Sequence, residues 1–130
     1  MHDMLVPISP GELLDKVTIL RIKAARISDA AKLANVRHEL SLLEQVWREA
    51  ASAQVDLAAE EADLLAVNTE LWDIEDHIRE HEAQRRFDAA FIELARSVYH
   101  RNDERAAIKK RVNLKLSSSI VEEKSYRGYR

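Results

Sequence analysis

The stretch from Asp56 to Gln84, DLAAEEADLLAVNTELWDIEDHIREHEAQ, contains neither glycine nor proline. It carries apolar residues at regular seven-residue steps, at Leu57, Leu64, Leu71 and Ile78. Because a helix turns by about 100° per residue, this spacing puts one apolar stripe along a single helix. At about 1.5 Å per residue the helix would span on the order of 40 Å. The stretch therefore predicts a helix longer than a compact domain of this size requires.

A second long helix is predicted from residues 88–116, DAAFIELARSVYHRNDERAAIKKRVNLKL, which also lack glycine and proline. Their apolar stripe lapses after Val98 and resumes at Ile108. Asn102 and Asp103 lie in that gap and form a further capping signal. The sequence is therefore compatible with one continuous helix or with a helix that breaks at this point. Only a few residues join the two long segments, so we expect an antiparallel helical hairpin.

Two shorter helices are predicted before this hairpin. Ser9 can cap a helix that has Pro10 at its first position and Glu12 as capping-box partner, and an apolar stripe follows. A second stripe covers residues 30–51, and the small and polar residues 51–55 indicate a loop. We expect these two helices to form a second, shorter hairpin.

The composition favours an all-α fold. The 130 residues are 46% apolar and 33% charged and include only two glycines and two prolines, so tight turns between strands are disfavoured. The length predicts one domain. We expect a single helical domain, a coiled-coil-like bundle of about four helices in two hairpins. The expected helices span 9–28, 30–51, 56–84 and 88–116, followed by a docked C-terminal tail at 117–130.

Charge and hydropathy disfavour several function classes. No apolar run approaches the roughly 18 residues of a membrane span, and the start lacks signal-peptide features, so we expect a cytoplasmic protein without a membrane span. Residues 56–84 hold ten acidic side chains against one arginine, and residues 96–115 hold seven basic side chains against two acidic ones. Antiparallel packing would neutralise these charges, for example Glu61 against Lys109, so we expect no nucleic-acid binding.

Polar side chains interrupt the apolar stripes of both long helices, at positions where a helical projection would place buried residues. Of the four cations on the first helix, Lys16 alone borders the apolar stripe. Antiparallel packing brings the interruptions of the long helices together, with Asn102 near Asn68. The expected interhelical cluster consists of Lys16, Asn68, Glu75, Arg79, Asn102, Arg105 and Lys109.

This cluster has two explanations. Buried polar side chains can form a hydrogen-bonded network that fixes register or oligomeric state, as in coiled coils. Alternatively, the cluster lines a pocket between helices, where its cations would meet an anionic small molecule and Glu75 would serve in acid–base chemistry. A closed, packed cluster favours the first explanation. A solvent-connected cavity lined by Glu75, Asn102 and Arg105 favours the second.

Known catalytic and metal-binding motifs are weak or absent. His77 and His81 flank Glu80 in an H-x-x-E-H pattern, which is typical of a class of zinc peptidases, but both histidines project to the solvated side of the helix. There is no cysteine, no nucleophile elbow and no glycine-rich phosphate or dinucleotide loop. We therefore expect no metal and no cofactor. Trp47 and Trp72 lie on or beside apolar stripes and are interpreted as core or interface anchors.

Five segments are distinctive when taken together: ISPGELLDKVTIL at 8–20, NTELWDIED at 68–76, FIELARSVY at 91–99, NDER at 102–105 and VEEKSY at 121–126. They resemble a family of bacterial proteins of about this length and of unknown function. The resemblance covers nearly the whole chain and implies no established activity or catalytic residue. It implies an association with genes for surface polysaccharide or lipopolysaccharide, which favours a sugar-related role. The segments include Asn68, Glu75, Asn102 and Arg105.

We expect a homodimer with a binding or assembly role, because the long helices carry stripes that a second subunit would bury. The first hypothesis is an interaction module that docks a partner protein, for example a glycosyltransferase of envelope polysaccharide synthesis, through its long helices and its tail. The second is a small helical enzyme or ligand-binding protein that acts on an anionic metabolite through the interhelical cluster. The sequence leaves open whether the protein is an enzyme.

Overall fold

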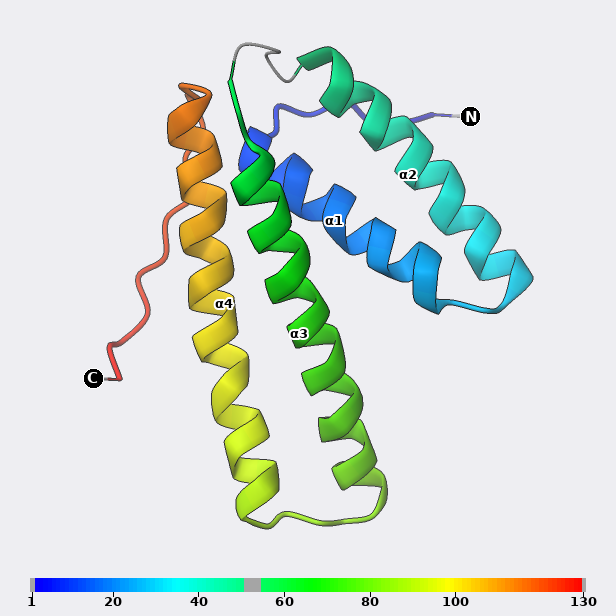
Figure 1. The fold of residues 1–130 in the computed structure, drawn as a ribbon, viewed down its shortest axis with the longest axis vertical. Coiled ribbons are helices and arrows are strands. Elements are labelled where there is room, and N and C mark those ends of the chain that lie inside the picture. Colours follow the sequence, from blue (N-terminus) through cyan, green and yellow to red (C-terminus); the bar gives the residue numbers. More distant parts are fainter. Residues whose placement is uncertain (1, 51–54, 130) are drawn as a thin grey trace.

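The computed structural model describes residues 2–50 and 55–129, and in these residues the chain is all-α, as expected. The helices are α1 (Pro10–Arg26), α2 (Ala30–Ala50), α3 (Ala58–Ala83) and α4 (Ala89–Lys115). They form two hairpins, α1–α2 and α3–α4, which cross each other (Figure 1). Each helix end lies within two residues of its expected position, and α4 continues without a break through Asn102 and Asp103. The loop expected at 51–55 falls outside the described residues except for Val55. None of the described helices is both long and apolar enough to cross a membrane.

Helix α1 begins where the cap signal predicts. The Ser9 hydroxyl accepts a hydrogen bond from the Glu12 amide (3.2 Å), and Pro10 occupies the first turn. The Glu12 carboxylate pairs with Lys16 and Lys109 instead of closing a capping box. The ion pair with Lys109 joins the start of α1 to α4.

Helix α1 is the central element of the bundle. It packs against each of the other three helices, whereas α2 packs on α1 alone in the part of the chain that the structure describes (Figure 1). Leu13, Val17 and Leu20 are buried along the predicted stripe, and Leu14 and Ile22 are buried on another face of the helix. A core cluster then joins α1 to α3 and α4, and its members are Leu14, Leu57, Leu64, Val67, Ile108 and Val112.

Gly11 allows α1 to approach α4 closely. A β-carbon at this position would clash with the backbone carbonyl of Lys109 and would lie 2.8 Å from the side-chain oxygen of Asn113. The Gly11 amide donates a hydrogen bond to the same Asn113 oxygen (2.7 Å). Only a residue without a side chain fits at this crossing.

Helices α3 and α4 pair in antiparallel orientation, with a register close to the expected one. Arg111 lies 3.2 Å from Asp63 across the pair. The expected pair of Glu61 with Lys109 is wrong, because α1 supplies other partners to both residues. Glu61 pairs with Arg21 of α1, and Lys109 pairs with acidic residues of α1 and of the tail.

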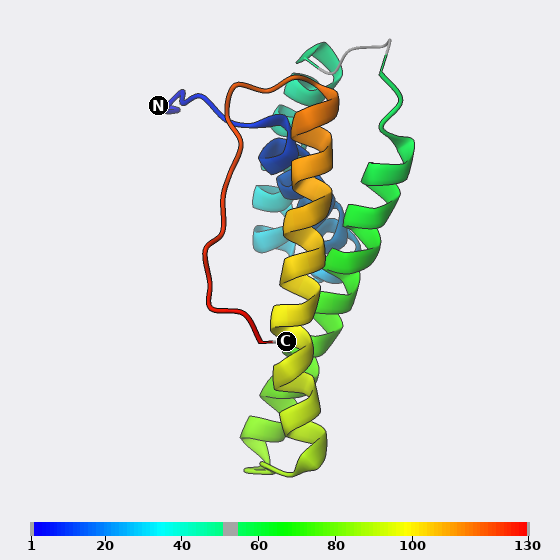
Figure 2. The ribbon, with the colours of Figure 1, turned by 90° about the vertical axis from the view of Figure 1, so that its left-hand side faces the viewer.

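Residues 69–107 of the α3–α4 hairpin are called the arm here. Its root contacts α1, through the pairs of Arg26 with Asp73 and of Asp15 with Arg105, and its outer part extends past α1 (Figures 1 and 2). All residues of the arm are described, and none of them is buried. The expectation that Glu75 and Arg79 lie at buried positions is therefore wrong. Helix α1 ends at Arg26 and covers only the inner part of the hairpin. Of the polar residues of α3 that were expected to be buried, only Asn68 lies under this cover and is buried.

The C-terminal tail runs back along α4 toward the arm (Figure 2). Glu122 lies 3.3 Å from Lys109, and the Tyr129 hydroxyl donates a hydrogen bond to Asp103 (2.8 Å). Both contacts are exposed to solvent. The Tyr129 ring also lies 4.9 Å from the ring of Tyr99 and 4.8 Å from that of His100, so the tail lies against α4 through polar and aromatic contacts.

Candidate functional site

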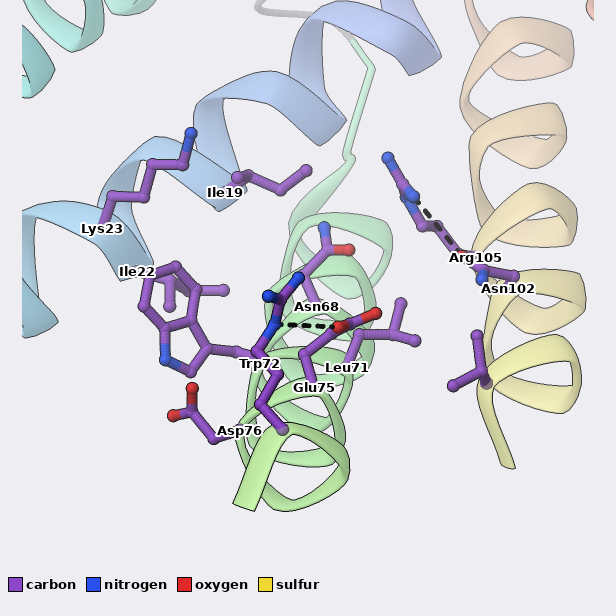
Figure 3. Close-up of a pocket in the computed structure, with 12 residues that line it drawn as sticks. Ile19, Ile22, Lys23, Asn68, Leu71, Trp72, Glu75, Asp76, Asn102 and Arg105 are labelled. Carbon is purple, nitrogen blue, oxygen red and sulfur yellow. Dashed lines mark hydrogen bonds and ion pairs between the residues drawn. The ribbon is translucent and has the colours of Figure 1, made fainter. Parts of the chain in front are cut away.

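A notch opens where α1 crosses the root of the arm (Figure 3). It has a volume of about 490 Å³, and its walls come from α1, α3 and α4. Its apolar surface comes from Ile19, Ile22, Leu71, Trp72 and Val98. The polar and charged residues that line it are Lys23, Asn68, Glu75, Asp76, Arg79, Asn102 and Arg105. A cavity of this size and mixed lining is typical of small-molecule sites.

A buried hydrogen-bonded network lies behind the inner wall of the notch. Its centre is Asp15 of α1, which is fully buried. One carboxylate oxygen of Asp15 accepts from the side-chain amide of Asn68 (2.9 Å) and from Nε of Arg105 (2.9 Å). The other oxygen accepts from Nη2 of Arg105, and the Asn68 amide also donates to Oγ1 of Thr18 (3.0 Å). One carboxylate thus joins α1, α3 and α4.

The pair of Asp15 and Arg105 is bidentate and balanced in charge. Hydrogen bonding to Asp15 raises the pKa of Arg105 and outweighs burial, which lowers it. A buried carboxylate needs such a partner, because an unpaired buried charge costs several kcal/mol. Arg105 therefore stabilises the fold and brings no uncompensated positive charge to the notch.

Two amide side chains of the network keep unused hydrogen-bonding atoms. The nitrogen of Asn68 must face Asp15, because the carboxylate would repel the amide oxygen, and that oxygen has no partner among the residues described. The oxygen of Asn102 accepts from Nη1 of Arg105 (3.4 Å), since a guanidinium only donates, and this leaves the Asn102 nitrogen unused. The wall of the notch therefore offers one acceptor and one donor in positions that the network fixes.

The outer rim of the notch is charged and exposed. Glu75 and Arg79 form the pair expected from their four-residue spacing, at 3.5 Å, with side chains 53% and 79% exposed. Lys23 of α1 and Asp76 of α3 also line the notch, and neither has an ion-pair partner within residues 2–50 and 55–129. The Arg26 guanidinium lies 6.0 Å from the centre of the Trp72 ring, within range of a cation–π contact.

The residues of the expected cluster divide into two groups. Lys16 lies outside the notch, with a side chain 49% exposed and 3.9 Å from Glu12. Lys109 lies near the start of α1, between Glu12 and Glu122. Burial lowers the pKa of Lys109, but the hydrogen bond and the charge of Glu12 outweigh burial and raise it. The five that line the notch are Asn68, Glu75, Arg79, Asn102 and Arg105.

The helical projection missed Asp15 and selected the wrong cation of α1. It assumed one buried face, yet α1 is covered on more than one side, so Asp15 is buried and Lys23, rather than Lys16, lines the notch. The sequence does carry a signal for this, because adjacent apolar pairs occur at 13–14 and 19–20. A helix with apolar residues on most sides is typical of a buried helix.

The H-x-x-E-H segment lies on the arm, outside the notch. His77 is exposed, and the ring of His81 is hydrogen-bonded to the carbonyl oxygen of His77 (2.9 Å). Over the described ranges, histidine, aspartate and glutamate side chains form no group of three or more that could hold a metal ion. The H-x-x-E-H segment is therefore not part of the notch.

The comparisons with known proteins identify a family without a known activity. No curated protein matches the chain, and no solved structure matches it. A model for a family of unknown function, DUF6165, matches residues 4–129. This match spans all four helices, the notch and almost the whole tail. The chain therefore belongs to the family of unknown function DUF6165.

Proposed function

We propose that this protein binds a small organic molecule in the notch between α1 and the arm. The observation that carries the proposal is a cavity of about 490 Å³ whose inner wall is held by the pair of the buried Asp15 and the partly buried Arg105. A wall fixed in this way needs little reordering when a ligand enters, and preorganisation lowers the entropic cost of binding. The unused amide atoms of Asn68 and Asn102 would orient the ligand, and Trp72 would supply apolar contact.

Binding is better supported than catalysis. Glu75, the expected acid–base residue, is 53% exposed and is paired with Arg79 at 3.5 Å. Catalytic acids and bases are typically placed where burial or neighbouring charges tune them to the reaction. The proposal is therefore a ligand-binding role without a chemical step.

A thermal-shift screen tests this role. The protein is heated alone and with panels of amino acids, carboxylates, phosphorylated metabolites and sugars. A ligand present at 100 times its Kd stabilises the native state by about 2.7 kcal/mol, so at least one panel is expected to raise the Tm. Asn102→Ala removes an amide from the wall and is expected to reduce that increase. Asn35→Ala, on the exposed surface of α2, is expected to keep it.

Two results would contradict the proposal. One is a Tm that no panel raises. The other is a Tm increase of the same size in Asn102→Ala as in the wild type, which would place the ligand elsewhere. The Tm without ligand serves as the control that both variants are folded.

A second candidate function, self-assembly, is favoured by how little the arm buries. None of residues 69–107 is buried, and the whole chain exposes 9218 Å². A compact monomer of 14.9 kDa exposes about 7,000 Å². The excess, roughly 2,000 Å² per chain, is more than the roughly 800 Å² that each partner buries in a standard protein interface. A homodimer whose arms pack together, as in a coiled coil, would account for it.

Sedimentation equilibrium tests the homodimer. The expected molar mass is twice the 14.9 kDa of one chain. Leu94 lines an apolar groove of the arm together with His77 and His81, so Leu94→Glu is expected to give monomers. Leu42→Glu, on the exposed surface of α2, is the matched control and is expected to leave the dimer intact. A wild-type protein that stays monomeric at micromolar concentration contradicts this candidate.

An arm without buried residues also suits a partner protein. Removal of residues 120–130 is expected to abolish capture of such a partner and to leave the core folded, because the tail contacts α4 at the surface. A glycosyltransferase of envelope polysaccharide synthesis as that partner is a proposal that rests on the resemblance of five sequence segments. A cytoplasmic location is a proposal of the same kind.

A further inference from the structure

The charges around the notch largely cancel. Arg105 is tied to Asp15, and Arg79 is tied to Glu75 at 3.5 Å. A doubly charged anion such as phosphate would therefore meet no excess of positive charge in the walls. This balance argues against the anionic metabolite that the sequence suggests.

One charge of each sign remains without a counter-charge. Lys23 comes from α1 and Asp76 from α3, both line the notch, and neither forms an ion pair with any residue that the structure describes. In Figure 3 they lie on either side of the indole of Trp72. The unused amide atoms add one donor and one acceptor to these two charges. The Asn102 nitrogen is a donor, like the ammonium group of Lys23, and the Asn68 oxygen is an acceptor, like the carboxylate of Asp76.

We infer that the ligand of the notch is a small zwitterion of the amino-acid type with an apolar side chain. Its carboxylate would lie at Lys23, its ammonium group at Asp76, and its apolar side chain on the surface formed by Trp72, Ile22 and Leu71. Such a ligand is neutral overall, which matches the balanced charges, and it gives each unpaired charge a partner. The inference rests on the proposed ligand-binding function and names the class of ligand.

Calorimetric titration of the full chain with four probes tests this class. L-phenylalanine carries both charges, N-acetyl-L-phenylalanine carries only the carboxylate, and L-phenylalaninamide carries only the ammonium group. Inorganic phosphate is the fourth probe. We expect L-phenylalanine to bind at least tenfold more tightly than either capped form, and phosphate to show no binding.

Two substitutions assign the charges to their partners. In Lys23→Gln, L-phenylalanine is expected to bind no more tightly than L-phenylalaninamide, which lacks the free carboxylate. In Asp76→Asn, L-phenylalanine is expected to bind no more tightly than N-acetyl-L-phenylalanine, which lacks the free ammonium group. Lys32→Gln and Glu39→Gln change exposed charges on α2 and are expected to bind L-phenylalanine as the wild type does. A Trp47→Phe background leaves Trp72 as the sole tryptophan, since the chain has two, and its fluorescence is expected to change on binding.

The possible results separate this inference from the function on which it rests. Equal binding of N-acetyl-L-phenylalanine overturns the zwitterion in favour of an anion, and equal binding of L-phenylalaninamide overturns it in favour of a cation. In both cases a ligand-binding role stands. If none of the four probes binds but another panel raises the Tm, the inference alone fails. If no panel raises the Tm, the proposed function fails as well.

Discussion

Asp15 and Arg105 form a pair in which the two residues differ in burial. Asp15 is fully buried, whereas the side chain of Arg105 is 30% exposed. Arg105→Met would leave a buried carboxylate without a counter-charge, so we expect it to lower the free energy of unfolding by about 3–5 kcal/mol. Asp15→Asn leaves a guanidinium with access to water and is expected to cost only about 1–3 kcal/mol. Urea unfolding measures both changes. Equal losses in Arg105→Met and Asp15→Asn would contradict this account, because the buried carboxylate left without a counter-charge would then add no cost of its own.

The pair of Glu12 and Lys109 predicts that the stability of the fold depends on pH. Burial raises the pKa of Glu12, but the hydrogen bond and the charge of Lys109 outweigh it and lower the pKa below its ordinary value of 4.5. A carboxyl group whose pKa is lowered by folding stabilises the fold above pH 4.5, and this contribution is lost as the pH falls below that value. Glu12→Gln is therefore expected to cost stability at about pH 7 and less at about pH 3.

Urea unfolding of wild type and Glu12→Gln at the two pH values checks this expectation. Glu39→Gln, an exposed glutamate of α2, is the control and is expected to change little at either pH. An equal cost of Glu12→Gln at both pH values would show that its charge does not contribute.

The sequence made part of the notch predictable. Asn68, Asn102 and Arg105 stand out because they interrupt apolar stripes of helices whose phase is clear from the seven-residue spacing. Asp15 does not stand out, because its burial depends on α1 being covered on a second face. That coverage comes from residues far away in the chain, as shown by the bond of Asp15 to Arg105, 90 positions away.

Among the helices, the crossing of α1 and α4 depends on Gly11. Gly11→Ala would place a β-carbon against the backbone carbonyl of Lys109, which cannot move without shifting α4. Alanine is favoured over glycine within a helix by about 1 kcal/mol, yet we expect a net loss of stability because the two helices must separate. Urea unfolding measures the change. Gly128→Ala is the matched control, since a β-carbon there meets nothing within 4 Å. A more stable Gly11→Ala protein would contradict the close approach.

The helices themselves follow from local signals, whereas their arrangement does not. The Ser9 cap, the absence of glycine and proline and the apolar spacing are sufficient to place the helix ends within two residues. The angle between the hairpins depends on contacts such as that between Gly11 and Asn113, which are 102 residues apart. A single sequence gives no direct information on such pairs.

At the scale of the whole molecule, the difference in length between α1 and α3 produces the two features on which the candidate functions rest, the notch and the arm. Helix α1 has 17 residues and α3 has 26, so α1 covers only the inner part of the α3–α4 hairpin. The notch lies where that cover ends, and beyond it the arm has no third layer to pack against (Figure 1). A helix normally buries its apolar stripe against another element, so the arm is the part of the molecule that a second chain would complete.

The central claim is that small molecules bind in the notch, and mapping where they bind tests it most directly. ¹H–¹⁵N correlation spectra of the full chain would be recorded with a fragment library of zwitterions, carboxylates, phosphates and sugars. The expected result is that shifts concentrate on the side-chain amides of Asn68 and Asn102 and on the indole N–H of Trp72. Shifts confined to the arm groove around His77 and His81, or no shifts with any fragment, would contradict the account.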